Sequence, residues 1–158
     1  MVQQQIGDLL EIEEGGLSFY VVVLTKRVML GGSILFAFHN DGRKCRFSNL
    51  SQNSSGFNIC ADLLLPKREG RVTRLHRYAE VGPFWRSNYA KATVEYRRGV
   101  KAKEWFIYDI SDLSKQHIAR IPTLTSEYRE AMDCSCYSFD LVAKKVLARY
   151  TPDQNEHI

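Results

Sequence analysis

Three short apolar segments separated by glycine turns occupy the first 40 residues and constrain the fold more than any other feature. The turns contain Gly15-Gly16 and Gly31-Gly32, and the segments span residues 9–12, 17–25 and 33–39. Glycine adopts the positive φ angles that a tight hairpin turn requires. Short connections of this kind join neighbouring antiparallel strands, so the sequence predicts an antiparallel meander. The six consecutive apolar residues 19–24 predict either a second strand that is buried on both faces or a segment whose apolar pattern is ambiguous.

The rest of the chain predicts further strands and one or two helices. Strand-forming side chains recur over residues 57–61, 90–96 and 104–109. Apolar residues at helical spacing predict a helix over 139–150 with Ser138 as its N-cap, and a shorter helix over 125–132. The predicted fold class is α+β, mostly antiparallel β with an N-terminal meander and one or two C-terminal helices.

Length and composition fit one globular domain. The chain has 158 residues, of which 44% are hydrophobic and 25% are charged, close to the average of soluble proteins. We expect a single domain over residues 1–158 with flexible tails at 1–5 and 152–158. The N-terminus lacks the basic and apolar regions of a secretory signal, and the longest apolar run is much shorter than the roughly 20 residues of a membrane span. The sequence therefore predicts a cytoplasmic protein that does not enter a membrane.

The cysteines predict free thiols rather than a metal site. Cys45, Cys60, Cys134 and Cys136 are expected to stay reduced, as is usual in the cytosol. Cys134 and Cys136 are separated by a single residue, whereas structural zinc sites usually place roughly two to four residues between paired thiolates. We expect no metal and no cofactor.

No motif for a known catalytic chemistry is present in the sequence. It contains no glycine-rich phosphate loop, no metalloprotease helix and no nucleophile elbow. A histidine-based enzyme remains a further alternative, because imidazole titrates near neutral pH and the chain contains His39, His76 and His117. Their spacing does not bring them together, and the simpler interpretation of His39 is a residue of the turn that follows the third segment. We therefore expect a protein that is not an enzyme.

Residues 67–103 form a basic stretch that contains 11 of the 22 lysines and arginines and only three acidic residues. Aromatic side chains alternate with the arginines, which is typical of single-stranded nucleic-acid binding and also of protein interfaces. A third interpretation is an ordinary solvated face over core aromatics. We predict five partner contacts in this stretch: Arg74, Arg77, Trp85, Arg86 and Tyr89.

The N-terminal 25 residues contain acidic side chains and no basic one, so the net charge of +4 conceals an acidic and a basic segment. Such an asymmetry favours electrostatic steering toward a specific partner. Glu13 and Glu14 are therefore an alternative pair of partner contacts.

The N-terminal pattern resembles the immunity protein 26 family of bacterial polymorphic-toxin and contact-dependent growth inhibition systems. The similarity lies in Gly-Asp-Leu-Leu-Glu-Ile at 7–12, the Gly15-Gly16 turn and the aromatic-to-valine segment 19–24. Members usually have proline where this chain has Glu13, and commonly have glycine where it has Val21. The resemblance covers about 40 residues.

The resemblance implies an immunity protein that binds and occludes a cognate toxin domain without catalysis. Immunity proteins against nucleases are often acidic, whereas this chain is basic overall. Either the toxin is not a typical basic nuclease, or the acidic segment docks, or the inhibitor binds away from the active site. The alternative function is binding of RNA or single-stranded DNA through the stretch 67–103, with an affinity that falls steeply with salt.

Overall fold

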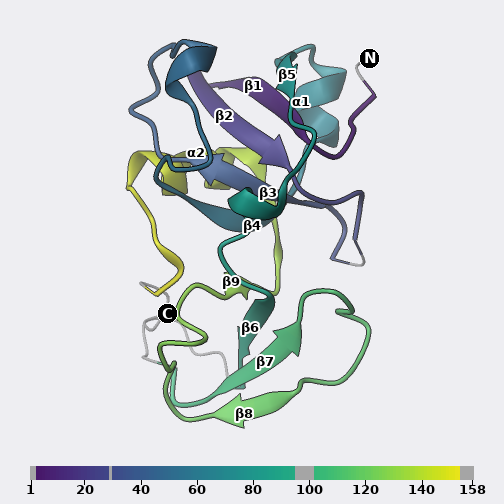
Figure 1. Cartoon of the computed structure of the whole chain (residues 1–158), viewed down its shortest axis with the longest axis vertical. Helices are drawn as coiled ribbons and strands as arrows, with labels where there is room; N and C mark the ends of the chain where they lie inside the picture. The colour runs from purple at the N-terminus through teal and green to yellow at the C-terminus, as the bar shows by residue number, and fades with distance from the viewer. Residues whose placement is uncertain (1–2, 29, 95–101, 154–158) are drawn as a thin grey trace.

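The computed structural model describes residues 3–28, 30–94 and 102–153, and these contain a larger and a smaller β-sheet with two α-helices (Figure 1). The larger sheet contains β1 (Asp8–Glu14), β2 (Leu17–Val23), β3 (Ser33–Phe38), β4 (Gly56–Asp62), β5 (Val72–Arg77) and β10 (Cys136–Ser138). The smaller sheet contains β6 (Tyr89–Thr93), β7 (Trp105–Asp109), β8 (Ala119–Ile121) and β9 (Met132–Asp133). The helices are α1 (Leu64–Arg68) and α2 (Phe139–Leu147), with 3-10 turns at Phe47–Asn49 and Gly82–Phe84.

The N-terminal meander is confirmed. The strand order of the larger sheet is β10-β4-β3-β2-β1-β5, and β1 to β4 are joined as consecutive antiparallel neighbours. Gly15 and Gly16 form the first turn with φ angles of 59° and 78°. Register partners Glu14 and Leu17 flank this turn, which fixes which side chains share a face.

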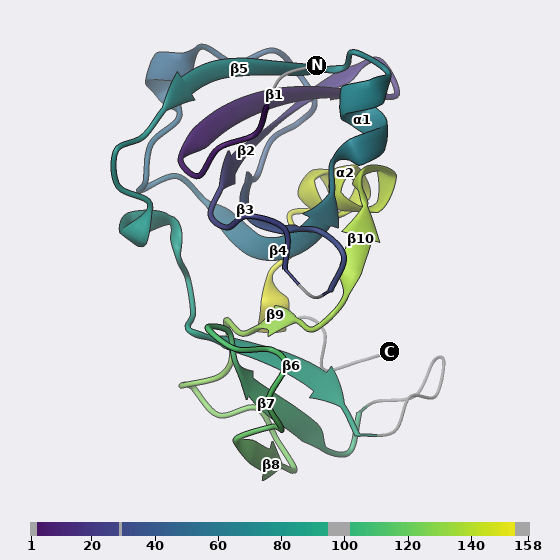
Figure 2. The same cartoon turned by 90° about the vertical axis from the view of Figure 1, so that its right-hand side faces the viewer.

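Both faces of the larger sheet are buried at its central strands, β2, β3 and β4. One face packs on α2, where Phe139 and Val142 meet apolar side chains from β1 to β4. The other face carries a second core that includes Tyr20, Phe36 and Phe84. Residues of β2 from position 18 onward are all buried, which confirms the prediction of a strand covered on both sides. Figure 2 shows the curvature of this sheet, with α1, α2 and β10 close together at one end.

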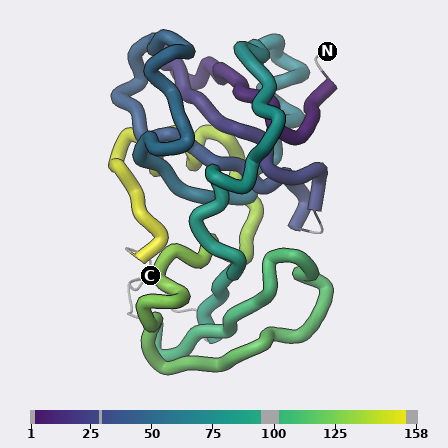
Figure 3. The backbone as a smooth tube through the Cα atoms, viewed as in Figure 1, coloured from purple at the N-terminus to yellow at the C-terminus, as the bar shows by residue number. Residues whose placement is uncertain are grey.

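The smaller sheet has the order β8-β7-β6-β9 and a small core of its own. Trp105 and Ile107 of β7 belong to this core, whereas Ala90 of β6 and Met132 of β9 join the second core of the larger sheet. The chain passes from β5 into the smaller sheet and returns through β9 and β10 to α2 (Figure 3). No helix in the described part of the chain is long and apolar enough to cross a membrane.

Two of the local predictions are corrected at the C-terminal end. The helix predicted over 125–132 is wrong, because residues 126–130 form turns and Met132 begins β9. The helix predicted over 139–150 is present as α2 with Ser138 at the N-cap position, but it ends at Leu147. Of the predicted tails, residues 1–2 and 154–158 lie outside the described residues. In the described parts, Gln4 donates a hydrogen bond to Ser33, and Pro152 is buried.

Candidate functional site

The arginines Arg74 and Arg77 lie together on β5, the edge strand of the larger sheet. Every residue of β5 is at least partly exposed, and its neighbour on the inner side is β1. The Nε–H of Arg77 donates to Oδ1 of Asp8 at 2.7 Å, and Asp8 is fully buried. Arg74 is exposed, and none of the ion pairs within the described ranges involves it.

The first part of the basic stretch lies beside the acidic segment, because β5 pairs with β1. Strands β1 and β5 pair antiparallel, so Asp8 faces Arg77 at one end of the pair. At the other end, Arg71 forms ion pairs with Glu14 and Glu69, and its side chain also donates to the carbonyl of Glu13. Strand pairing therefore places two carboxylates of β1 against two arginines from the first part of the basic stretch, Arg71 and Arg77.

The other predicted contacts lie elsewhere in the fold. Trp85 and Arg86 follow the 3-10 turn Gly82–Phe84, and both are half-buried. The Arg86 guanidinium donates to three backbone carbonyls and lies 4.4 Å from the centroid of the Phe36 ring. Tyr89 belongs to β6 of the smaller sheet, where its hydroxyl donates to Glu127 at 3.3 Å. The predicted contacts are thus divided among three places, and the guanidinium of Arg86 is engaged within the chain.

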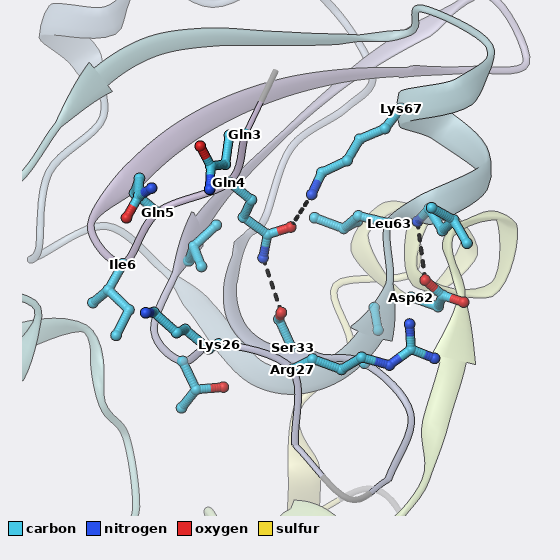
Figure 4. Close-up of a pocket in the computed structure, with 15 residues that line it drawn as sticks. Gln3, Gln4, Gln5, Ile6, Lys26, Arg27, Ser33, Asp62, Leu63 and Lys67 are labelled. Carbon is cyan, nitrogen blue, oxygen red and sulfur yellow. Dashed lines mark hydrogen bonds between the residues drawn. The ribbon is translucent and has the colours of Figure 1, made fainter. Parts of the chain in front are cut away.

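A cavity of about 470 Å³ lies near α1 and the loop between β2 and β3. Its basic side chains are Lys26 and Arg27 of that loop and Lys67 of α1. Lys67 points toward Gln4 and donates to its side-chain oxygen, and the Gln4 amide donates to Oγ of Ser33 at 2.9 Å (Figure 4). These residues come from four separate segments of the sequence, and only the fold brings them to one cavity.

Positive charge predominates in this cavity. Burial lowers the pKa of Lys67, although the carboxylates of Asp62 and Asp8 oppose this shift. Asp62 is the single carboxylate among the lining residues, and its Oδ1 already accepts the backbone N–H of Leu64 at 2.9 Å. A half-buried ammonium whose hydrogen-bond partner is a neutral amide would be stabilised by an added negative charge. The cavity is therefore suited to a carboxylate or another anion.

The cavity and the arginine-bearing edge are neighbours. Residues 3–6 line the cavity, and Gly7, the next residue, passes so close to the carbonyl of Tyr78 that a Cβ there would collide with it. Tyr78 in turn directly follows Arg77 at the end of β5. We define the cationic surface as Lys26, Arg27, Lys67, Arg74 and Arg77.

Comparisons with family models, with curated proteins and with solved structures each give no match to this chain. The resemblance to the immunity protein 26 family therefore stays a prediction. The residues that carry it, 7–24, form β1, β2 and the hairpin turn between them.

The histidines have separate environments. Nε2 of His39 lies 2.6 Å from the carbonyl oxygen of Tyr150, and its Nδ1 lies 2.5 Å from Oγ of Ser55. A carbonyl only accepts, so Nε2 carries a proton and donates it to the carbonyl oxygen of Tyr150. His76 stacks on Phe47 and His117 lies on the ring of Phe106. In the described ranges, no group of three or more His, Cys, Asp or Glu side chains is placed to hold a metal ion.

A second basic and aromatic feature was missed at the sequence level. Phe47 is 43% exposed, and its ring centroid lies 4.6 Å from that of His76. The loop before Phe47 carries three exposed cations, Arg43, Lys44 and Arg46. The local sequence Arg-Lys-Cys-Arg-Phe could have indicated this feature, because it combines three cations with an aromatic ring in five residues.

Proposed function

We propose that this protein is a cytoplasmic immunity protein that binds and neutralises a cognate toxin domain without catalysis. The observation that carries the proposal is the cavity whose lining includes three cations, Lys26, Arg27 and Lys67, and a single carboxylate, that of Asp62. Such a receptor complements an acidic group, and complementary charge accelerates and orients the association of two proteins. The resemblance of residues 7–24 to immunity proteins supports the same function.

The proposed contact combines the cavity with the edge of the larger sheet. A carboxylate of the toxin domain enters the cavity and pairs with Lys67. The exposed strand β5 offers backbone groups to an extended segment of the toxin domain, as in β-strand addition. Arg74 then contacts acidic side chains beside that segment, while Arg77 remains paired with Asp8 and holds β5 against β1.

Growth protection tests this proposal. The chain is co-expressed with the toxin domain encoded immediately beside its own gene, and growth is compared for wild type and variants. We expect wild type to restore growth and the double variant Lys67→Gln/Arg74→Ala to lose most of the protection. Lys115→Gln is the matched control, because Lys115 pairs with Asp112 outside the cationic surface. The proposal would be contradicted if the double variant protected as well as wild type, or if wild type gave no protection.

A second candidate function is single-stranded nucleic-acid binding at Phe47 and His76. The stacked, exposed rings offer a base-stacking platform, and Arg43, Lys44 and Arg46 supply cations for phosphates. Binding of a labelled oligouridylate tests this candidate. The affinity should fall steeply with salt concentration, and Phe47→Ala should weaken binding about tenfold or more. The variant Lys67→Gln should leave this binding unchanged. Absence of oligonucleotide binding at low salt removes this candidate.

A further inference from the structure

Three of the four cysteines gather where the returning chain joins the larger sheet. Cys60 lies in β4, and Cys136 is the first residue of β10. Cys134 lies between β9 and β10, and its partly buried side chain packs on the same apolar core as Cys60. Cys45 lies in a different loop, where its backbone N–H donates to the hydroxyl of Tyr20.

The strand register places Cys60 and Cys136 directly opposite each other. Strands β4 and β10 pair in parallel, and these two cysteines are register partners. Adjacent strands are separated by about 4.7–4.9 Å, which lies within the Cα–Cα range of disulfides, about 4.4–6.8 Å. Because directly paired residues project to the same face of a sheet, the two thiols point to one side of it.

The surrounding backbone leaves room for the Cys136 thiol. A Cβ added to Gly32 would lie 2.7 Å from Sγ of Cys136 and would also collide with the carbonyl of Ala61. Glycine at position 32 therefore lets β10 approach β4 with the sulfur of Cys136 directed inward. The sulfur is close enough to Cys60 to act on it both through its charge and as a hydrogen-bond partner.

The two thiols differ in access and reactivity. Cys60 is fully buried, whereas Cys136 is half-exposed. Burial raises the pKa of the Cys60 thiol, and the Cys136 sulfur raises it further. Burial also raises the pKa of Cys134, and the carboxylate of Asp133 adds to that shift. Since an oxidant reaches a half-exposed side chain more readily than a fully buried one, oxidation of this pair begins at Cys136.

We propose that Cys60 and Cys136 form a reversible redox pair that closes to a disulfide when a hydroperoxide oxidises Cys136. In the first step the Cys136 thiolate attacks the peroxide, the O–O bond breaks, and a sulfenic acid and an alcohol or water form. In the second step the Cys60 sulfur attacks the sulfenic sulfur, and the hydroxyl leaves with the Cys60 proton as water. Two thiols are thereby oxidised by two electrons, and one hydroperoxide is reduced.

The disulfide would add a covalent link to the short parallel pairing of β10 with β4, beside the core contacts that already join the two sheets. β10 pairs with β4 over three residues, and the chain just before it forms β9 of the smaller sheet. A covalent link at Cys136 would hold this returning segment against the larger sheet. Oxidation should therefore raise the thermal midpoint of the protein, and reduction with dithiothreitol should reverse the change.

Peptide mapping of the native full-length protein tests the pair. The protein is treated with hydrogen peroxide, alkylated under denaturing conditions and digested with trypsin. We expect a crosslinked product that joins the Cys60 peptide to the Cys134–Cys136 peptide, with two hydrogen atoms lost, and that dithiothreitol separates. Cys134 and Cys136 fall in one tryptic peptide, so the variant Cys134→Ser identifies the partner and should retain the crosslink.

Two further variants make the result decisive. Cys136→Ser, a change at a half-exposed position, should abolish the crosslink, whereas the matched control Cys45→Ser should leave it unchanged. Circular dichroism checks that each variant is folded. Three results would overturn the proposal. They are complete alkylation of Cys60 after peroxide treatment, a disulfide between Cys134 and Cys136, and a crosslink that persists in Cys136→Ser.

Discussion

The six-stranded and four-stranded sheets differ in how their strands are covered and how far apart in the sequence their partners lie. The strands β1 to β4 of the larger sheet have six or seven residues each and are buried on both faces by two apolar cores. In the smaller sheet β8 has three residues and β9 has two, and the core that belongs to that sheet alone is small. Because two large apolar cores cover the larger sheet, its stability should depend on buried side chains to a much greater degree.

The largest difference is expected for phenylalanine truncations in the two sheets. Phe36 of β3 is fully buried, whereas Phe106 of β7 is half-buried against His117. Phe36→Ala should lower the free energy of unfolding by about 3–5 kcal/mol through lost burial and a cavity, and Phe106→Ala by about 1 kcal/mol. Urea denaturation measures both values. Equal costs would show that the burial of the ring does not decide how much stability its removal costs.

An intermediate difference is expected for the ion pairs. Arg77→Ala leaves the buried carboxylate of Asp8 without its cation and should destabilise the protein by about 2–3 kcal/mol. Arg120 pairs with Glu104 at the surface of the smaller sheet, so Arg120→Ala should leave the thermal midpoint nearly unchanged. Differential scanning calorimetry of both variants measures their thermal midpoints. A similar decrease in the two variants would contradict the expected difference.

Alanine substitutions of two glycines should differ in their effect on stability, because Gly56 lies in β4 and Gly82 lies in the connection between the two sheets. A Cβ at Gly56 would collide with the carbonyl of Ala37 and the ring of Phe36, whereas one at Gly82 meets open space. Gly56→Ala should therefore cost about 1–3 kcal/mol, and Gly82→Ala should be neutral or slightly stabilising. Thermal unfolding of the two variants measures this. A neutral Gly56→Ala would mean that β3 and β4 can move apart without loss.

The smallest expected effect is the pH dependence of the Glu104–Arg120 pair in the smaller sheet. The hydrogen bond from Arg120 lowers the pKa of Glu104 below its ordinary 4.5. A carboxyl group whose pKa is lower in the folded state than in the unfolded state stabilises the protein at pH values above its unfolded-state pKa. This stabilisation is lost as the pH falls through the folded-state pKa. NMR titration should place the pKa of Glu104 below 4.5 in wild type and nearer to it in Arg120→Ala. An identical titration in the two proteins would show that the pair does not form in solution.

Much of the larger sheet could be predicted because its signals are local. The turns at Gly15 and Gly31 and the apolar runs beside them specify β1, β2 and β3 without reference to distant residues. β5 could not be predicted in the same way, because its residues are exposed and their pairing with β1 spans some 60 positions. The pairing of β10 with β4 is equally non-local and involves three residues.

The candidate site was predicted only in part for the same reason. Residue type alone selected Arg74 and Arg77, and the structure places both on one edge strand. Lys26, Arg27 and Lys67 have no shared motif in the sequence and meet because the β2–β3 loop and α1 lie around one cavity. The contact of Asp8 with Arg77 could not be predicted from the charge pattern along the chain, because it depends on the pairing of β1 with β5.

Binding of the product of the neighbouring gene tests the central proposal, that the cationic surface recognises an acidic toxin domain. Calorimetric titration compares wild type, Lys67→Gln/Arg74→Ala and the control Lys115→Gln at low and high salt. We predict tight binding by wild type that weakens with salt, a loss of about 10-fold to 100-fold in the double variant, and no change in the control. An affinity that is independent of salt and equal in all three proteins would contradict the account.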